Sequence, residues 1–180
     1  MNAILSQLGI IIVGLDDFPQ IGEIEETGST LLENSLIKAR TVHKITGLPA
    51  LADDTGLEVD ALDGAPGVFS ARYSGPNCNS SENMALLLKN LANFSNKKAR
   101  FRTVITYRDE MEIIQFEGIV NGIIIGKGRG NYGFGYDPIF IPDGSQLTFA
   151  EMPLEEKNKF SHRARAFEKL KSYLMDKLQA

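Results

Sequence analysis

The sequence predicts one globular domain of the α/β class. Three segments have the apolar spacing of helices, at about residues 31–45, 80–94 and 161–178, and several apolar or β-branched runs are typical of strands. A chain of 180 residues with 43% hydrophobic and 23% charged residues is long enough to bury its own core. We therefore expect a single domain over residues 1–180.

The first elements are expected to be a short buried strand and a capped helix. The apolar run at residues 10–13 favours the strand. A helix should begin after Thr30, which is a good N-cap, and Glu33 stands three residues further on, as in a capping box. Gly47 is a suitable C-terminal cap, so this helix should end near residue 45.

A short strand at residues 48–52 leads into two adjacent carboxylates, Asp53 and Asp54. Neighbouring carboxylates repel each other, so both stay ionised at low cost only if a metal ion or a basic group offsets their charge. Hard oxygen ligands of this kind suit Mg²⁺. The alternative is a solvated turn closed by Gly56, because Asp-Asp-Thr-Gly is also ordinary turn chemistry.

The second half of the chain alternates strands with two further helices. Ser80 or Ser81 can cap a helix whose apolar stripe faces the core, and Ser161 can cap the last helix. Strand-like runs lie between these helices, at residues 100–108, 112–117, 119–125 and 138–141. The first three of these runs should pair antiparallel.

Charge and composition exclude several classes of function. A formal net charge of −4 argues against general electrostatic binding to nucleic acid, which needs a basic face. The apolar run at residues 10–13 is too short to cross a bilayer. The single cysteine, Cys78, cannot form an internal disulfide, and the N-terminus does not resemble a secretory signal, so we expect a cytoplasmic protein.

A glycine-rich string, Gly128 to Gly133, matches the dinucleotide-binding pattern G-x-G-x-x-G. That pattern works only where a strand turns into a helix whose N-terminus holds the pyrophosphate. The element expected next is the strand at residues 138–141, so we interpret the match as accidental.

Two polar clusters remain open to two interpretations. Phe134-Gly-Tyr-Asp137 is either the end of a hairpin or a place where a flat ligand approaches the backbone. Residues 155–163 are either a solvated charge run or a group of donors, Lys157, His162 and Arg163, near a helix N-terminus that suits an anion or a ring carbonyl. Glu33 is likewise either the capping residue or a second carboxylate for a cation near Asp54.

Taken together, these segments resemble the inosine triphosphate pyrophosphatase family, whose members cleave non-standard purine nucleoside triphosphates such as ITP, dITP and XTP to the monophosphate and pyrophosphate. The motifs that carry the resemblance follow one another in the same order as in the family, at residues 30–39, 52–60, 64–75, 133–138 and 157–163. The resemblance implies a long mixed β-sheet flanked by helices, two lobes with a central cleft, and a homodimer.

The resemblance also implies roles for individual residues. Glu33 and Asp54 would hold Mg²⁺, and Asp54 would be the catalytic carboxylate that activates or orients water. The residues that would bind the substrate are Thr55, Phe134, Gly135, Tyr136, Asp137, Lys157, His162 and Arg163. Of these, Phe134 would stack on the purine, while His162 and Arg163 would donate to its 6-oxo group, which adenine lacks. The resemblance does not explain how guanine, which has its own 6-oxo group, is excluded.

The N-terminus departs from the family pattern, in which a first strand is followed by a T/S-x-N-x-x-K turn that holds the triphosphate. Residues 2–8 look like the last turns of the helix after that motif. Either the start codon is assigned too far downstream, or this version lacks a strand and its phosphate lysine. In the second case we would expect a catalytically impaired nucleotide-binding dimer. A pyrophosphatase with another base preference is a third possibility.

Overall fold

The computed structural model describes residues 5, 8–159 and 161–179. Its sheet has the strand order β1-β2-β3-β4. The strands and α-helices are β1 (Ala50–Val59), β2 (Lys98–Arg108), β3 (Ile113–Ile124), β4 (Phe140–Pro142), α2 (Leu31–Thr46), α3 (Ser80–Leu91), α4 (Leu154–Asn158) and α5 (His162–Gln179).

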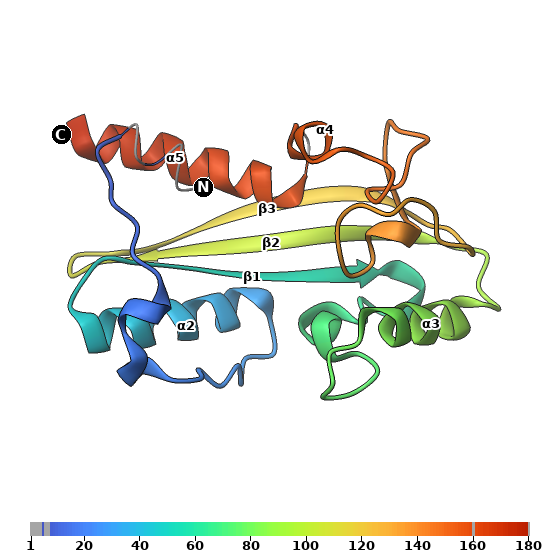
Figure 1. The fold of residues 1–180 in the computed structure, drawn as a ribbon, viewed down its shortest axis with the longest axis horizontal. Coiled ribbons are helices and arrows are strands. Elements are labelled where there is room, and N and C mark those ends of the chain that lie inside the picture. The colour runs from blue at the N-terminus through green and yellow to red at the C-terminus, as the bar shows by residue number, and fades with distance from the viewer. Residues whose placement is uncertain (1–4, 6–7, 160, 180) are drawn as a thin grey trace. The chain divides into compact units, whose positions relative to one another are not determined.

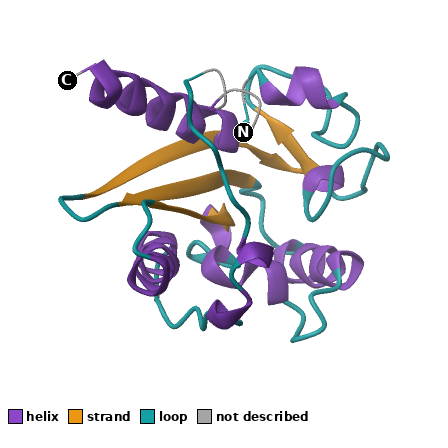
Figure 2. Cartoon of the chain, turned by 60° about the vertical axis from the view of Figure 1, so that its left-hand side comes forward, coloured by secondary structure: helices purple, strands orange, loops and turns teal. Residues whose placement is uncertain are grey.

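The α/β class is confirmed, and the four described strands form an antiparallel sheet. A tight turn joins β2 to β3 (Figure 2), and β4 pairs with the end of β3 in the register Gly122 opposite Pro142. A parallel strand, which a mixed sheet would require, is not among the strands that the structure describes. Within the same residues, no helix is both long enough and apolar enough to cross a membrane.

The chain divides into two compact units, each built around its own core. The first unit consists of residues 1–54, 104–117 and 166–180, and the second of residues 55–103 and 118–165. The boundary within β1 falls between Asp54 and Thr55.

In the first unit, the strands lie between α2 on one side and α5 on the other (Figure 1). The apolar stripe predicted for the last helix is confirmed at Phe167, Leu170 and Leu174, which pack against β2 and β3. Helix α2 is joined to the strands by polar contacts, because the buried Ser35 hydroxyl donates to Ala52 O at 3.0 Å and lies 2.6 Å from the hydroxyl of Thr106.

The helix predicted from Thr30 onward is confirmed with both of its ends. Thr30 Oγ1 accepts from the Glu33 N–H at 3.1 Å, the Glu33 side chain accepts from the Thr30 N–H, and Gly47 closes the helix in the left-handed conformation with φ of 68°. This capping box satisfies N–H groups that the first turn leaves without intrahelical partners.

The second unit has the larger aromatic core, in which Phe101, Phe140 and Phe149 contact one another. Helix α3 buries Leu87 and Leu91 against this cluster. The cap of α3 is Asn79, one residue before the predicted Ser80, because the Asn79 side chain accepts from the N–H groups of Ser81 and Glu82.

Other sequence predictions were wrong. Residues 10–13 belong to no strand, and Ile11 is 88% exposed, because this segment pairs with no strand among the described residues. The two strands expected at residues 112–117 and 119–125 form the single strand β3, in which Gly118 continues the extended backbone. The last strand is shorter than expected, since residues 137–139 form a 3₁₀ turn.

The capping box gives a stability prediction. Replacing Thr30 with Ala removes the hydroxyl that accepts from Glu33 N–H. We therefore expect the free energy of unfolding, measured by urea titration, to be about 0.5–2 kcal/mol lower than in the wild type. The control is Thr41→Ala in the middle of the same helix, where the side chain makes no hydrogen bond to the described residues. Equal destabilisation by both variants would contradict this explanation.

Candidate functional site

The sequence-predicted site residues fall into one cluster in each unit. Glu33 and Asp54 belong to the first unit. The residues predicted to bind the substrate belong to the second unit and are Thr55, Phe134, Gly135, Tyr136, Asp137, Lys157, His162 and Arg163.

The two adjacent aspartates are separated by the alternation of a β-strand. Strand β1 continues through them to Val59, so the prediction that the strand stops at Ala52 was wrong. Successive side chains of a strand point to opposite faces. Asp53 is therefore exposed, whereas the Asp54 side chain is 12% exposed and faces Lys38.

Asp54 sits in a pair of carboxylates that share one lysine. Lys38 Nζ lies 3.1 Å from Asp54 Oδ1 and 2.9 Å from Glu26 Oε1. The second oxygen, Asp54 Oδ2, is buried and has no hydrogen-bond partner among the described residues. A buried acceptor without a partner is costly, which makes it a suitable ligand atom for a cation or for a substrate donor.

The electrostatics of this cluster follow from its burial. Burial raises the pKa of Asp54 because the charged form is desolvated, and the neighbouring Lys38 ammonium only partly offsets this effect. Burial alone would lower the pKa of Lys38, but hydrogen bonds and charge from Glu26 and Asp54 raise that pKa above its usual value.

Glu33 forms the capping box, which is one of the two roles that the sequence leaves open for it. Its Oε2 accepts from the N–H and hydroxyl of Ser29 and from the N–H of Thr30, and the Ser29 hydrogen bonds lower the pKa of the Glu33 carboxyl. The structure thus gives Glu33 the capping role.

Glu26 is a candidate site residue that sequence reasoning missed. It lies in the segment before α2, where no spacing rule connects it to Asp54, and only the fold brings both carboxylates to Lys38. Among the described residues, no three His, Cys, Asp or Glu side chains form a ready metal site. The donor set that fits a hard cation is therefore Asp54, with its orphaned oxygen, together with Glu26.

The second cluster surrounds a cavity of about 220 Å³ in the second unit. This volume lies below the roughly 300–1,000 Å³ of sites for whole drug-sized ligands, so it suits part of a ligand, such as a flat ring. Seven of the predicted residues line it, namely Thr55, Phe134, Gly135, Tyr136, Asp137, His162 and Arg163. The free cysteine, Cys78, lies in the same lining and is exposed.

His162 is the unsatisfied polar group of this cavity. Its side chain is 2% exposed, its ring stacks on Phe101 at 4.8 Å between centroids, and neither ring nitrogen has a partner among the described residues. Burial, with smaller contributions from Arg163 and Lys157, lowers the pKa of His162 to about 3. The imidazole is thus neutral, with one donor and one acceptor available to a ligand.

Phe134 provides a flat surface at the cavity, and its side chain is 65% exposed. Lys157 Nζ and Arg163 Cζ lie 5.2 and 5.3 Å from the centroid of its ring. Cations over an aromatic face are held by the negative face of the ring. The cluster therefore combines a stacking surface with positive charge.

Asp137 holds this arrangement together. Its Oδ2 accepts from Lys157 Nζ at 2.5 Å and from the Phe134 N–H at 2.9 Å, and Asp137 is 2% exposed. Lys157 is thereby fixed beneath the ring, although it does not line the cavity. Gly133 is required in this turn, because its φ is 74° and a Cβ atom would lie 2.1 Å from Asp137 Oδ2.

Two further predicted residues use their hydroxyls within the protein. Thr55 Oγ1 lies 2.6 Å from Thr103 Oγ1, and the Tyr136 hydroxyl donates to Ser70 O at 3.0 Å. Burial raises the pKa of Tyr136, so this hydroxyl stays protonated and keeps donating. Both residues shape the cavity wall.

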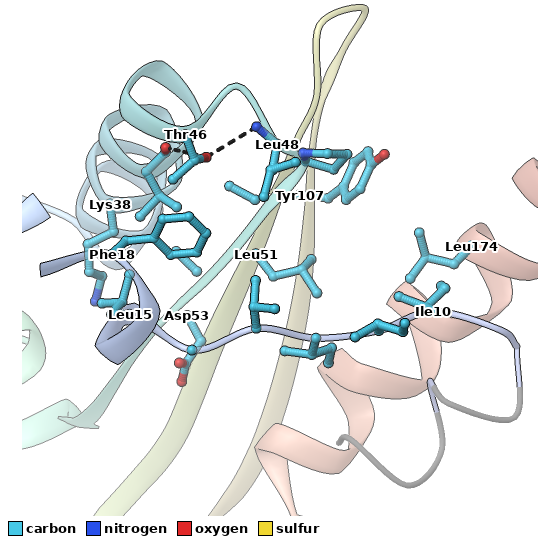
Figure 3. A pocket seen from close by; sticks show the side chains of 18 of the residues that line it. Ile10, Leu15, Phe18, Lys38, Thr46, Leu48, Leu51, Asp53, Tyr107 and Leu174 are labelled. Carbon is cyan, nitrogen blue, oxygen red and sulfur yellow. Dashed lines mark hydrogen bonds between the residues drawn. The ribbon is translucent and has the colours of Figure 1, made fainter. Parts of the chain in front are cut away.

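The first unit also contains a larger apolar pocket of about 850 Å³ (Figure 3). Residues 10–15, Phe18 and Leu51 contribute to its lining, with Lys38 and Asp53 toward one end and Tyr107 and Leu174 toward the other. Most of these lining residues are apolar, and they do not provide a set of hydrogen-bond donors that point toward one ligand position.

Comparison with known proteins places this geometry in a family. The model of the Ham1 family matches residues 1–173. The chain is 52% identical to a dITP/XTP pyrophosphatase of Porphyromonas gingivalis, over 91% of this chain and 85% of that protein. It is 48% identical to a protein of the same name from Geobacter sulfurreducens, over 96% and 88% of the two chains.

Solved structures agree with these matches. The Ham1 protein of Staphylococcus aureus superposes with a TM-score of 0.93 at 37% identity, covering 98% of this chain and 91% of that one. A nucleoside-triphosphatase / dITP/XTP pyrophosphatase of Mycobacterium abscessus superposes with a TM-score of 0.82 at 42% identity, covering 93% and 89%. On its sequence and on its fold, the chain belongs to the Ham1 family.

Proposed function

We propose that this protein hydrolyses non-standard purine nucleoside triphosphates, namely ITP, dITP and XTP, to the monophosphate and pyrophosphate. The observation that carries the proposal is His162, a neutral, buried imidazole without a partner in a cavity of base size. Relatives that are 52% and 48% identical to this chain over the aligned residues are named dITP/XTP pyrophosphatases, which supports the same reaction class.

Asp54 is the proposed catalytic residue. Hydrolysis between the α- and β-phosphates needs an aligned water and neutralisation of the charge on the polyphosphate. A carboxylate whose pKa is raised by burial is a better proton acceptor than a solvated one, and Lys38 fixes the orientation of Asp54 through Oδ1. Oδ2 is then the atom that accepts the proton of the attacking water.

Mg²⁺ is the proposed cofactor. Bound to carboxylate oxygens, it supplies charge neutralisation and polarises phosphoryl oxygens. Asp54 would be one of the residues that hold it. Glu26 is the stronger candidate for the second ligand, because Glu26 shares Lys38 with Asp54, whereas the Glu33 Oε2 is already used in the capping box.

The base is selected by hydrogen bonds from the second unit. His162 and Arg163 donate to the 6-oxo group of hypoxanthine or xanthine, and Phe134 stacks on the ring. Adenine presents an amino group at the same position, which cannot accept from the Arg163 guanidinium, a group that only donates. Sites of this type discriminate by as much as about 10⁴-fold.

A catalytically silent nucleotide-binding protein is not favoured, because the chain matches most of the length of relatives that are named as enzymes. We further propose that the protein acts as a homodimer in the cytoplasm, where nucleotides are made. The resemblance of the sequence to the inosine triphosphate pyrophosphatases supports the dimer, and light scattering on the purified protein tests it.

The central prediction concerns Asp54. With Mg²⁺, the wild type should release pyrophosphate from ITP and XTP at least about a hundredfold faster than from ATP, because only the oxo bases satisfy the donors. Asp54→Asn should abolish release without lowering the melting temperature, since the amide removes a charge that burial disfavours. Equal wild-type rates on ITP and ATP would refute the selectivity.

The two glutamates can be compared directly. Glu26→Gln removes the charge beside Asp54, so we expect the Mg²⁺ concentration for half-maximal rate to rise about tenfold or more. Glu33→Gln is the matched variant. It should leave this concentration nearly unchanged and lower only thermal stability, because its carboxylate caps α2. The reverse outcome would restore Glu33 as the metal ligand.

His162 gives a prediction on acid stability. Its pKa is about 3 in the folded protein and 6.5 in the unfolded chain, so the unfolded chain binds more protons between these values. Stability due to His162 is therefore complete above pH 6.5 and falls as the pH drops toward 3, by at most about 1.4 kcal/mol per pH unit.

His162→Gln should remove this contribution and give a shallower slope of unfolding free energy between pH 4 and 6, measured by urea titration at each pH. The wild type, measured at the same pH values, is the reference. Identical slopes for His162→Gln and the wild type would show that this imidazole is not buried in neutral form.

A further inference from the structure

We infer that Asn83 determines specificity in the base cavity, because its amide occupies backbone acceptors that a purine 2-amino group would need. Guanine shares the 6-oxo group of hypoxanthine and differs from it by this amino group, so His162 and Arg163 alone do not reject it. The inference rests on the proposed function. It adds to that function a residue that positions one wall of the cavity, the 3₁₀ helix Gly67–Arg72.

Asn83 lies on α3, is 3% exposed and belongs to the cavity lining. Its Oδ1 accepts from the N–H and the hydroxyl of Ser74 at 2.6 and 2.7 Å. Its Nδ2 donates to Ala71 O at 2.8 Å and to Ser70 O at 3.4 Å. Both ends of the amide are thus engaged, and its orientation is fixed by this pattern of donors and acceptors.

The wall that Asn83 holds is the 3₁₀ helix Gly67–Arg72. Ser70 and Ala71 of this helix line the cavity together with His162. Ser70 O also accepts from the Tyr136 hydroxyl at 3.0 Å, so its two lone pairs both have partners. The Ser70 hydroxyl donates to Gly67 O and accepts from the Leu57 N–H, which anchors the same turn to β1.

This pattern has a consequence for the base. When the 6-oxo group of the purine lies at His162 and Arg163, we expect its 2-position to face the part of the lining that contains Ala71 and Asn83. A 2-amino group there would have to compete with Asn83 Nδ2 for Ala71 O, or would be buried with a donor unsatisfied. Hypoxanthine has only a hydrogen at this position.

The test converts the donor side of the amide into an acceptor. Asn83→Asp keeps the size of the side chain and its bonds from Ser74, but it frees Ala71 O and presents a carboxylate oxygen. The measurement is kcat/KM for dGTP relative to dITP. We expect this ratio to rise about tenfold or more in Asn83→Asp, and also in Asn83→Ala, which frees the same carbonyls.

Asn90→Asp on the exposed part of α3 is the control for the added charge and should leave the ratio unchanged. A purely structural role for Asn83 would lower kcat/KM for both substrates alike and leave the ratio at its wild-type value, and that result would overturn the inference. Should either variant fail to turn over, equilibrium binding of dGMP and dIMP gives the same ratio.

The two proposals fail separately. If the wild type does not hydrolyse dITP, the proposed function is wrong. If the wild type hydrolyses dITP in preference to dGTP and the ratio does not respond to Asn83→Asp, the function stands and the assignment of Asn83 is wrong.

Discussion

The second unit depends on one buried ion pair, Asp137 with Lys157. A carboxylate that is 2% exposed is tolerable only with charge-assisted hydrogen bonds, and Asp137 receives one from Lys157 and one from the Phe134 N–H. These bonds fix the turn that presents Phe134 and place the lysine under its ring. Removing either partner would leave an uncompensated charge in the interior.

In the first unit, Asp54 differs from Asp137 because its hydrogen bonding is incomplete. One of its oxygens is buried without a hydrogen-bond partner among the described residues, and burial disfavours its charge. Structural carboxylates of a fold are normally saturated with donors, as Asp137 is. An unsaturated one lowers the stability of the ligand-free protein and is retained where a ligand completes it.

Sequence reasoning succeeded where the signal was local. The helix after Thr30 and its end at Gly47 follow from residues within a few positions of each other, and the Ser161 cap, whose hydroxyl accepts from Ala164 N–H, has the same origin. It failed where distant segments decide. Glu26 meets Asp54 only through Lys38, and β1 continues past Asp54 because β2 pairs with it, whatever the local turn propensity of Asp-Asp-Thr-Gly.

The placement of Cys78 has a practical consequence. It is the single cysteine of the chain, it is exposed, and it lies in the lining of the 220 Å³ cavity of the second unit. A thiol-reactive fluorophore therefore attaches at one position of the native sequence, in the cavity that we propose binds the base. Ring stacking changes the polarity around such a dye, so occupancy of the cavity becomes a spectroscopic signal that requires neither turnover nor an engineered residue.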